Sequence, residues 1–314
     1  VIGRGDDPAA ATDAADRAGA WLAAAVDPAC PPAPAGDFSA EAAPDAYLAA
    51  VADVVDRIAA GELFQANIAR GWTGVLSADA DPFDVMLRLA DRASAYGAFW
   101  RLGDRAIVSN SPELFLTFDP GSRRIETRPI KGTRPRHADP ARDAALAAEL
   151  RVSAKDRAEN LMIVDLMRND LSRVSAPGSV STAALFEVES HPTVHHLVST
   201  VTGLARTGIG PAELLEATFP PGSITGAPKH QAMKVIAGHE PPRGPWCGSL
   251  FHIEDDGRLT ASVLIRTAAF ERAEGLWRFR TLAGAGIVAD SDPAAELAET
   301  EAKVRALREA LVGR

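Results

Sequence analysis

Residues 128–136 read Arg-Pro-Ile-Lys-Gly-Thr-Arg-Pro-Arg and separate a group of strand-like runs from a long helical stretch. Lys131 stands out in this segment because only five of the 33 basic residues are lysines. Arginine is effectively always charged, whereas a desolvated lysine can lose its proton and act as an amine nucleophile. Lys131 is therefore the first candidate catalytic residue. The alternative is a solvated charge at the end of a strand.

Upstream of this segment, the pattern predicts a helix near 11–25, a Pro-rich linker up to 43, and a helix that Pro44 opens. Residues 63–72 alternate as a strand, which places Gln65 and Asn67 on one face. Four short runs between 96 and 130, separated by turn residues, predict an antiparallel meander. Glu113 would lie near the start of the third run, and Lys131 just past the fourth.

Downstream, helices are expected at 139–171, 211–217 and 228–238, and a second strand-rich section at 246–288. The last helix starts with Asp292 as N-cap and Pro293 at its first position, which is a favoured combination. Two groups of strands, each followed by helices, predict a mixed α/β fold of the α+β type with mostly antiparallel sheets.

Composition excludes several classes of protein. An apolar content of 46% and a charged content of 24% are ordinary globular values. The sequence has no long apolar span and no signal-peptide pattern, so no membrane association and a cytoplasmic location are expected. The two cysteines form neither a disulfide framework nor a zinc-binding spacing. A net charge of −9 without a basic stripe argues against a nucleic-acid ligand.

Two helical segments carry carboxylates on one face. Asp156 and Glu159 are three residues apart, and Glu296, Glu299 and Lys303 lie within about 60° of one another at 3.6 residues per turn. If the two faces meet, they suit Mg²⁺, which takes one or two protein carboxylates and keeps sites for water and substrate oxygens. Two ordinary solvated helix faces are the alternative.

Two glycine-rich strings, at 222–229 and 284–289, resemble nucleotide-binding motifs only in part, because neither opens a helix in the required way. Both are predicted to be loops whose backbone amides approach a ligand. Arg266, in an apolar run predicted as a strand, needs a carboxylate partner from the protein or from a ligand. His196 is a weaker candidate, since a buried histidine is more often structural.

Eight ordered segments together resemble the chorismate-utilising enzymes, the family that includes anthranilate synthase component I, isochorismate synthase and salicylate synthase. They are GELFQANIAR, SPELFL, ETRPIKGTRPR, SAKDRAENLMIVDLMRNDL, HHLVSTV, FPPGSITGAPK, GAGIVADSDP and ETEAK. The resemblance runs from about residue 44 to the end. It implies two packed antiparallel sheets flanked by helices, with 44–314 as the chorismate-binding catalytic domain and 1–43 as the remnant of a shortened N-terminal lobe.

Within the family, members that add water carry a lysine base at the position of Gln65, so this chain resembles the ammonia users. The PIKGT form, in place of the PIAGT of anthranilate synthases, resembles the branch that makes 4-amino-4-deoxychorismate, the precursor of p-aminobenzoate and folate. Anthranilate formation is the neighbouring alternative. A non-catalytic scaffold subunit of an amidotransferase complex is the alternative from another class.

The resemblance also implies residue roles. Lys131 would attack C2 of chorismate while Glu113 protonates the departing C4 hydroxyl. Glu159 and Glu299 would bind Mg²⁺, with Glu296 and Asp156 behind them. Groups that hold the substrate carboxylates would be Arg266, Lys303 and the amides of Gly284, Ala285 and Gly286. His196 and Thr225 would line the ring, and Trp246 replaces a tyrosine that touches substrate in relatives.

Three departures from the family pattern matter: the short N-terminal region, Trp246, and Pro221, which replaces a small residue in the FP-x-G-S loop. The short N-terminal region makes feedback control by tryptophan doubtful, because that lobe forms the regulatory pocket in relatives. The sequence also lacks a Cys-His-Glu glutaminase set, because neither Cys30 nor Cys247 lies in a nucleophile-elbow context. A separate glutamine amidotransferase is therefore expected to supply ammonia.

Overall fold

The computed structural model describes residues 5–26 and 29–313. Residues 1–4 and 27–28 of the predicted N-terminal segment 1–43, and residue 314 of the predicted catalytic domain, lie outside the described residues. By internal contacts the chain divides into Val1–Pro31 and Pro32–Arg314. The first unit contains helix α1 (Pro8–Ala23), which confirms the helix expected near 11–25. The side chain of Asp7 caps α1 by accepting a hydrogen bond from the amide of Ala10. No helix in the described ranges is long and apolar enough to span a membrane.

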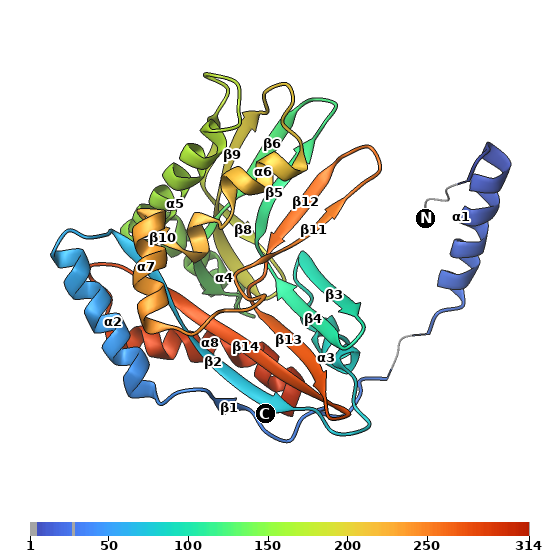
Figure 1. Ribbon diagram of the computed structural model, residues 1–314, viewed down its shortest axis with the longest axis horizontal. Helices are drawn as coiled ribbons and strands as arrows, with labels where there is room; N and C mark the ends of the chain where they lie inside the picture. The colour runs from blue at the N-terminus through green and yellow to red at the C-terminus, as the bar shows by residue number, and fades with distance from the viewer. Residues whose placement is uncertain (1–4, 27–28, 314) are drawn as a thin grey trace. The chain divides into compact units, whose positions relative to one another are not determined.

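The second unit contains two seven-stranded sheets with antiparallel pairing throughout (Figure 1). The first sheet has the order β1 (Ser39–Ala40), β2 (Gln65–Val75), β14 (Leu276–Ile287), β13 (Thr267–Ala273), β4 (Arg105–Ser111), β3 (Tyr96–Leu102), and β10 (Gly226–Ala227) also pairs with β2. The second has the order β11 (Ser249–Ile253), β12 (Leu259–Val263), β5 (Leu114–Asp119), β6 (Arg124–Arg128), β9 (Val194–Leu204), β7 (Ile130–Pro135), and β8 (Ser181–Ser190) also pairs with β9. The predicted fold class is confirmed.

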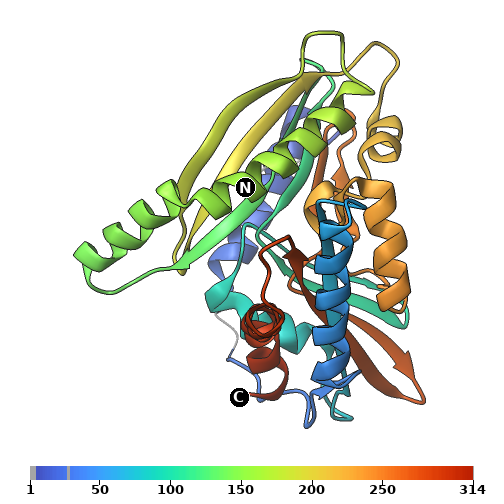
Figure 2. The ribbon, with the colours of Figure 1, turned by 90° about the vertical axis from the view of Figure 1, so that its left-hand side faces the viewer.

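Helices cover the sheets in two groups. Four helices contact the first sheet: α2 (Pro44–Ala59), α3 (Pro82–Leu89), α7 (Lys229–His239) and α8 (Pro293–Val312). The 3₁₀ turn η1 (Ala90–Arg92) follows α3. Those on the side of the second sheet are α4 (Pro140–Val152), α5 (Ala154–Ser172) and α6 (Pro211–Thr218), with the turn η2 (Gly222–Ile224) nearby. Figure 2 shows α5 running along the strands of the second sheet.

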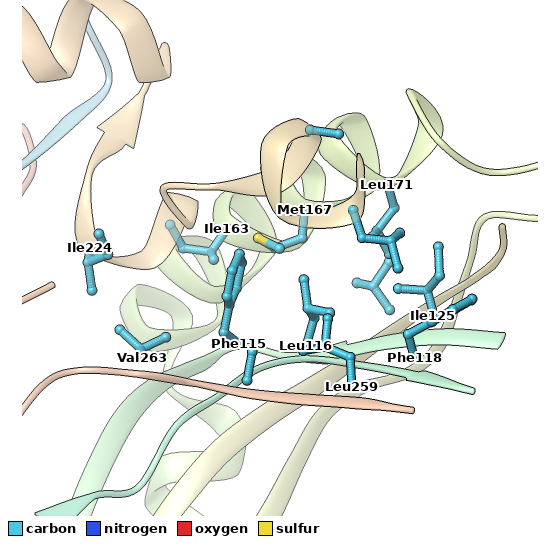
Figure 3. Close-up of a cluster of buried hydrophobic side chains, with 14 of the residues drawn as sticks. Phe115, Leu116, Phe118, Ile125, Ile163, Met167, Leu171, Ile224, Leu259 and Val263 are labelled. Atoms are coloured by element: carbon cyan, nitrogen blue, oxygen red, sulfur yellow. The ribbon is translucent and has the colours of Figure 1, made fainter. Parts of the chain in front are cut away.

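The largest hydrophobic core lies between α5 and the second sheet (Figure 3). Ile163, Met167 and Leu171 recur at helical spacing on α5 and pack against residues of β5 such as Phe115 and Leu116. Each of these five side chains is nearly inaccessible to solvent, so each contributes about 2–3 kcal/mol of hydrophobic stabilisation. This packing fixes α5, and therefore the polar residues in its first turns, relative to the sheet.

The predicted single meander at 96–130 is wrong, because its strands divide between the two sheets. Strands β3 and β4 pair in the first sheet, whereas β5 and β6 pair in the second. The chain changes sheets at Pro112, which has no amide hydrogen to continue the β4 ladder. Glu113 therefore lies at a crossing between sheets.

Lys131 lies just past the fourth run, β6, as expected, but on a further strand, β7. Two expectations are corrected by the strand assignments. Arg266 is not within a strand: it lies between β12 and β13 with φ 50°, where the chain crosses back to the first sheet. Gly284 and Gly286 belong to β14 rather than to a loop. In each case a long-range pairing, invisible in local sequence, determined the backbone.

Candidate active site

The two crossings between sheets are hydrogen-bonded to each other, and this brings Glu113 and Arg266 into one site. The amide of Asn110 donates to the carbonyl of Arg266 at 3.0 Å, and the amide of Val263 donates to the carbonyl of Glu113 at 3.1 Å. Among the described residues no ion-pair partner of Arg266 is found, although the negative charge of Glu113 acts to raise the pKa of Arg266. Burial lowers the pKa of Arg266, which means that the site would gain from an anionic ligand.

Lys131 reaches the site from the second sheet. The pairing of Thr133 with His196 holds its strand β7 against β9. The amine Nζ of Lys131 lies 2.9 Å from the position that a Cβ on Gly286 would occupy, and Cδ of Gln65 lies 3.2 Å from the same point. The amine, the Gln65 amide and the bare Gly286 backbone therefore share one small volume between the two sheets.

Gly284 and Gly286 present free backbone amides. Their partners on β2 are Ala69 and Asn67, whose own amides donate elsewhere, to Glu240 and Thr225. In an antiparallel ladder such pairs turn the N–H and C=O groups of both residues away from the neighbouring strand. The pairing of β13 with β14 ends at Ala268–Thr281, so on that side no described strand meets the two glycines.

The alternation gives Ala285 the opposite orientation, with its amide toward β2 and its side chain in the hydrophobic core. Of the three residues in the Gly-Ala-Gly string, the two glycines are therefore the ones that offer amides to an anion. The carbonyl of Gly284 is already bonded, since it accepts from Nζ of Lys303 at 2.8 Å.

Gln65 is fully buried on β2, and neither its oxygen nor its nitrogen has a hydrogen-bond partner among the described residues. Leaving a buried polar group unpaired costs about 1–3 kcal/mol, so such groups in native proteins usually meet a ligand or water. Trp246 is also buried, and its indole N–H has no partner among the described residues, but the ring belongs to the hydrophobic core around α5. The orphaned atoms of Gln65, close to the Lys131 amine, support the assignment of Gln65 to the substrate site.

The two reacting groups named from sequence have strongly shifted pKa values. Burial raises the pKa of Glu113 to about 7, against the opposing influence of nearby groups that include Lys131. Burial lowers the pKa of Lys131, and Lys303 lowers it further, while Glu159 and Glu113 act in the opposite direction. A carboxyl that holds its proton near neutrality therefore lies beside an amine that loses its proton more readily than usual.

His196 and Thr225 line the same region. Nδ1 of His196 lies 2.9 Å from the hydroxyl of Thr133, and burial, followed by the charge of Arg266, lowers the histidine pKa to about 4. The ring is therefore neutral at physiological pH. The hydroxyl of Thr225 donates to the carbonyl of Pro221 at 2.9 Å, which fixes the loop at 219–229 beside β2.

The two acidic helix faces come together at one side of this region. Burial raises the pKa of Glu159 on α5, and the charge of Glu299 on α8 adds to that increase. Burial would also raise the pKa of Glu299, but Lys303, with Nζ 2.6 Å from its Oε1, reverses the direction. Lys155 also influences the pKa values of both carboxylates.

The two carboxylates expected behind the first pair are engaged by the protein. Glu296 accepts a hydrogen bond from the hydroxyl of Ser291 at 2.7 Å, and Asp156 forms an ion pair with Arg134 at 3.1 Å. Glu301, which is the other acid of the ETEAK segment, is held 2.6 Å from Arg70. Glu299 is also paired, with Lys303, but it is the acid of that segment whose charge acts on Glu159.

A divalent metal would find two carboxylates here rather than a complete cage. Within residues 5–26 and 29–313, no three His, Cys, Asp or Glu side chains converge closely enough to hold a metal alone. Mg²⁺ is commonly held by one or two carboxylates together with water and substrate oxygens. The pair formed by half-buried Glu159 and the more exposed Glu299 therefore fits Mg²⁺, and suits less well a metal that requires four protein ligands.

Sequence reasoning missed two residues of the site. Asn67 was placed on the Gln65 face of the strand but given no role, although it is buried and its Oδ1 has no partner. Lys155 was counted among the rare lysines but not placed near the carboxylates. The same signals that identified Gln65 and Lys131, namely strand alternation and lysine scarcity, could have identified both.

The sequence pattern of the chorismate-binding enzymes matches residues 5–309. The chain is 48% identical over 247 residues to aminodeoxychorismate synthase component 1 of Klebsiella aerogenes, which covers 78% of this chain and 53% of that protein. It is 40% identical over 296 residues to anthranilate synthase component 1 of Aeropyrum pernix, which covers 89% of this chain and 65% of that protein. The chain thus spans about half the length of the relatives that it matches at highest identity.

The fold also matches a solved structure. Anthranilate synthase component I from Streptococcus pneumoniae superposes with a TM-score of 0.81 at 30% identity, over 96% of this chain and 66% of that chain. The antiparallel two-sheet architecture is therefore shared with an enzyme whose sequence has diverged substantially.

Proposed function

The chain belongs to the family of chorismate-binding enzymes, and we propose that it aminates chorismate with ammonia to give 4-amino-4-deoxychorismate. One observation carries this proposal: the amine of Lys131 shares a buried site with Glu113, whose pKa is about 7, and with the unpartnered amide of Gln65. A nucleophile, an acid and a non-basic amide are the groups that displacement of a hydroxyl by ammonia requires.

The first displacement would form a covalent adduct. Nζ of Lys131 bonds to C2 of chorismate, the ring double bonds shift, and the C4–O bond breaks. Glu113 donates its proton to the departing hydroxyl, which leaves as water. The lowered pKa of Lys131 supplies the neutral amine, and the raised pKa of Glu113 keeps the proton available at neutral pH.

The second displacement would release the lysine. Ammonia bonds to C4, the double bonds shift back, and the C2–N bond breaks, which returns the amine of Lys131. The new ammonium group passes a proton to the Glu113 carboxylate, so the enzyme regains its starting protonation state. Gln65 cannot remove a proton from water, which favours ammonia over water as the nucleophile.

The substrate carboxylates would be held by the cationic and amide groups around the ring. Within residues 5–26 and 29–313 Arg266 has no ion-pair partner, the amides of Gly284 and Gly286 face an open strand edge, and Lys303 lies at the same edge. Neutral His196, Thr225 and Trp246 would contact the ring itself. Glu159 and Glu299 would hold Mg²⁺, which when bound neutralises a substrate carboxylate.

The ammonia would come from a separate glutamine amidotransferase. Cys247 is buried in the core beside Arg243, and burial raises its pKa, so its thiol is not an activated nucleophile. Cys30 is exposed and lies in the first unit of the chain. Free ammonium is expected to replace the partner in vitro.

Anthranilate formation is the second candidate, supported by the 40% identity to an anthranilate synthase component 1. In that reaction the nitrogen is added at C2, where Lys131 is proposed to bond here. A direct test incubates the chain with chorismate, MgCl₂ and ammonium chloride and identifies the product by chromatography and mass spectrometry. A 4-amino-4-deoxychorismate peak supports the proposal, anthranilate supports the second candidate, and no turnover supports a scaffold role.

A further inference from the structure

We propose that Asn67 is a nitrogen-binding residue, which together with Gln65 holds the ammonia before it attacks the ring. The two residues lie two positions apart on β2, so their side chains leave the same face of the strand. The inference rests on the proposed amination and adds to it a residue to which no role has yet been given.

The backbone of Asn67 is held on both sides, which fixes the direction of its side chain. Its amide donates to the carbonyl of Thr225 at 2.8 Å, and its carbonyl accepts from Nη2 of Arg243 at 2.6 Å. Arg243 is itself held by Glu240 at 2.7 Å. With both backbone groups bonded, the Cα–Cβ bond of Asn67 is held in a fixed direction toward the site.

The side chain of Asn67 lies against strand β14 at Gly284. Its Oδ1 lies 2.8 Å from the position that a Cβ on Gly284 would occupy, just as Gln65 and Lys131 lie over Gly286. Gly284 and Gly286 are on the same face of β14, and two residues along a strand span about 7 Å. The side-chain oxygen of Asn67 therefore lies along the same face of β14 as the Gln65 amide and the Lys131 amine, one strand repeat away.

The chemistry of the unpaired atoms identifies the ligand. Oδ1 of Asn67 and Oε1 of Gln65 are both buried acceptors without partners among the described residues. Substrate carboxylates also only accept hydrogen bonds, so they cannot satisfy these oxygens. The C4 hydroxyl of chorismate is a donor, but it departs as water in the first displacement and leaves the oxygens open to ammonia. Ammonia carries three N–H donors and one lone pair, which lets it bond to both amides and still present its lone pair to the ring.

The test measures steady-state kinetics of Asn67→Ala, Asn67→Leu and Asn67→Asp with ammonium chloride, saturating MgCl₂ and chorismate. We expect the KM for ammonium to rise about tenfold in the Ala and Leu variants, as for loss of one hydrogen bond, while the KM for chorismate changes less than about twofold. Asn67→Asp keeps an acceptor oxygen and should retain most of the ammonium affinity.

Thermal unfolding provides an independent readout and a matched control. Asn67→Leu removes an unpaired buried acceptor, so its Tm should be unchanged or higher. Asn110 is also a buried asparagine, but its Oδ1 accepts from Ser94 at 2.7 Å and its Nδ2 donates to Arg92 at 3.0 Å. Asn110→Leu should therefore lower the Tm and leave the KM for ammonium unchanged.

Each other result overturns the inference in a recognisable way. A chorismate KM that rises in step with the ammonium KM would mean that Asn67 contacts chorismate instead. A lower Tm with unchanged kinetics would make Asn67 a structural residue. Absence of amination by the unmodified chain would reject the proposed function, and this inference with it.

Discussion

Lys131 and Gly286 lie on different sheets, yet the amine of one occupies the space that a side chain on the other would fill. Nζ lies 2.9 Å from the Cβ position of Gly286, which is closer than real Cβ contacts allow. A side chain at Gly286 would therefore displace the lysine amine, whereas the backbone dihedrals do not call for glycine, since Gly286 is in regular strand β14 without a positive φ.

Gly286→Ala should displace the amine of Lys131 and lower kcat about 100-fold, the cost of roughly 1 Å of misplacement. Gly238→Ala is the matched control, because Gly238 lies in α7 with nothing within 4 Å of its Cβ position. The control should keep full activity and gain up to about 1 kcal/mol in stability. Wild-type kcat in Gly286→Ala would show that the amine does not act from this position.

Lys131→Ala and Lys131→Arg separate nucleophilic from electrostatic roles. The Arg variant keeps the positive charge but cannot supply a neutral amine, so both should lose at least about 1,000-fold in formation of 4-amino-4-deoxychorismate. Any residual product of the Ala variant should shift toward anthranilate, because C2 is then open to ammonia. Product ratios from single-turnover reactions check this, and an active Arg variant would exclude the covalent route.

The raised pKa of Glu113 sets the pH dependence of activity. Its proton is needed for departure of the hydroxyl, so kcat/KM should fall as pH rises through about 7. The lowered pKa of Lys131 acts in the opposite sense, because it extends the range of the neutral amine toward lower pH. Glu113→Gln should abolish the alkaline limb together with nearly all activity.

Glu113 also links stability to pH. Its folded pKa of about 7 exceeds the usual 4.5, so the folded state binds more protons between these values. Stability is therefore highest below pH 4.5 with respect to this group and falls by roughly 3 kcal/mol as pH rises through 7. Glu113→Gln has no such ionisation. In urea unfolding, the free energy of unfolding of the variant relative to wild type should therefore increase from pH 4.5 to 8. A pH-independent difference would contradict the raised pKa.

Metal binding distinguishes two acids of the same helix. Glu299→Gln should raise the Kd for Mg²⁺, measured by calorimetry, at least about tenfold. Glu301→Gln is the control, since Glu301 is held by Arg70 at 2.6 Å and should leave the Kd unchanged. If Glu301→Gln raised the Kd for Mg²⁺ and Glu299→Gln left it unchanged, the assignment of Glu299 as a metal ligand would be wrong.

Local patterns predicted most of the elements but not their partners. The helix from Pro293 and the strand with Gln65 followed from capping residues and alternation, which depend only on neighbours in sequence. The division of 96–130 between two sheets and the crossing at Arg266 did not, because strand pairing is decided by contacts far apart in the chain.

The sequence by itself determined the family and the α+β class, and it proposed the reacting groups, because those depend on residue type and spacing. Only the tertiary structure decided that the Lys131 amine meets Gly286, that Glu113 and Arg266 share a pair of bonded crossings, and that Oδ1 of Asn67 has no partner among the described residues. The physical reason is burial: desolvation changes a pKa or leaves an amide without a partner, and burial exists only after distant segments have packed.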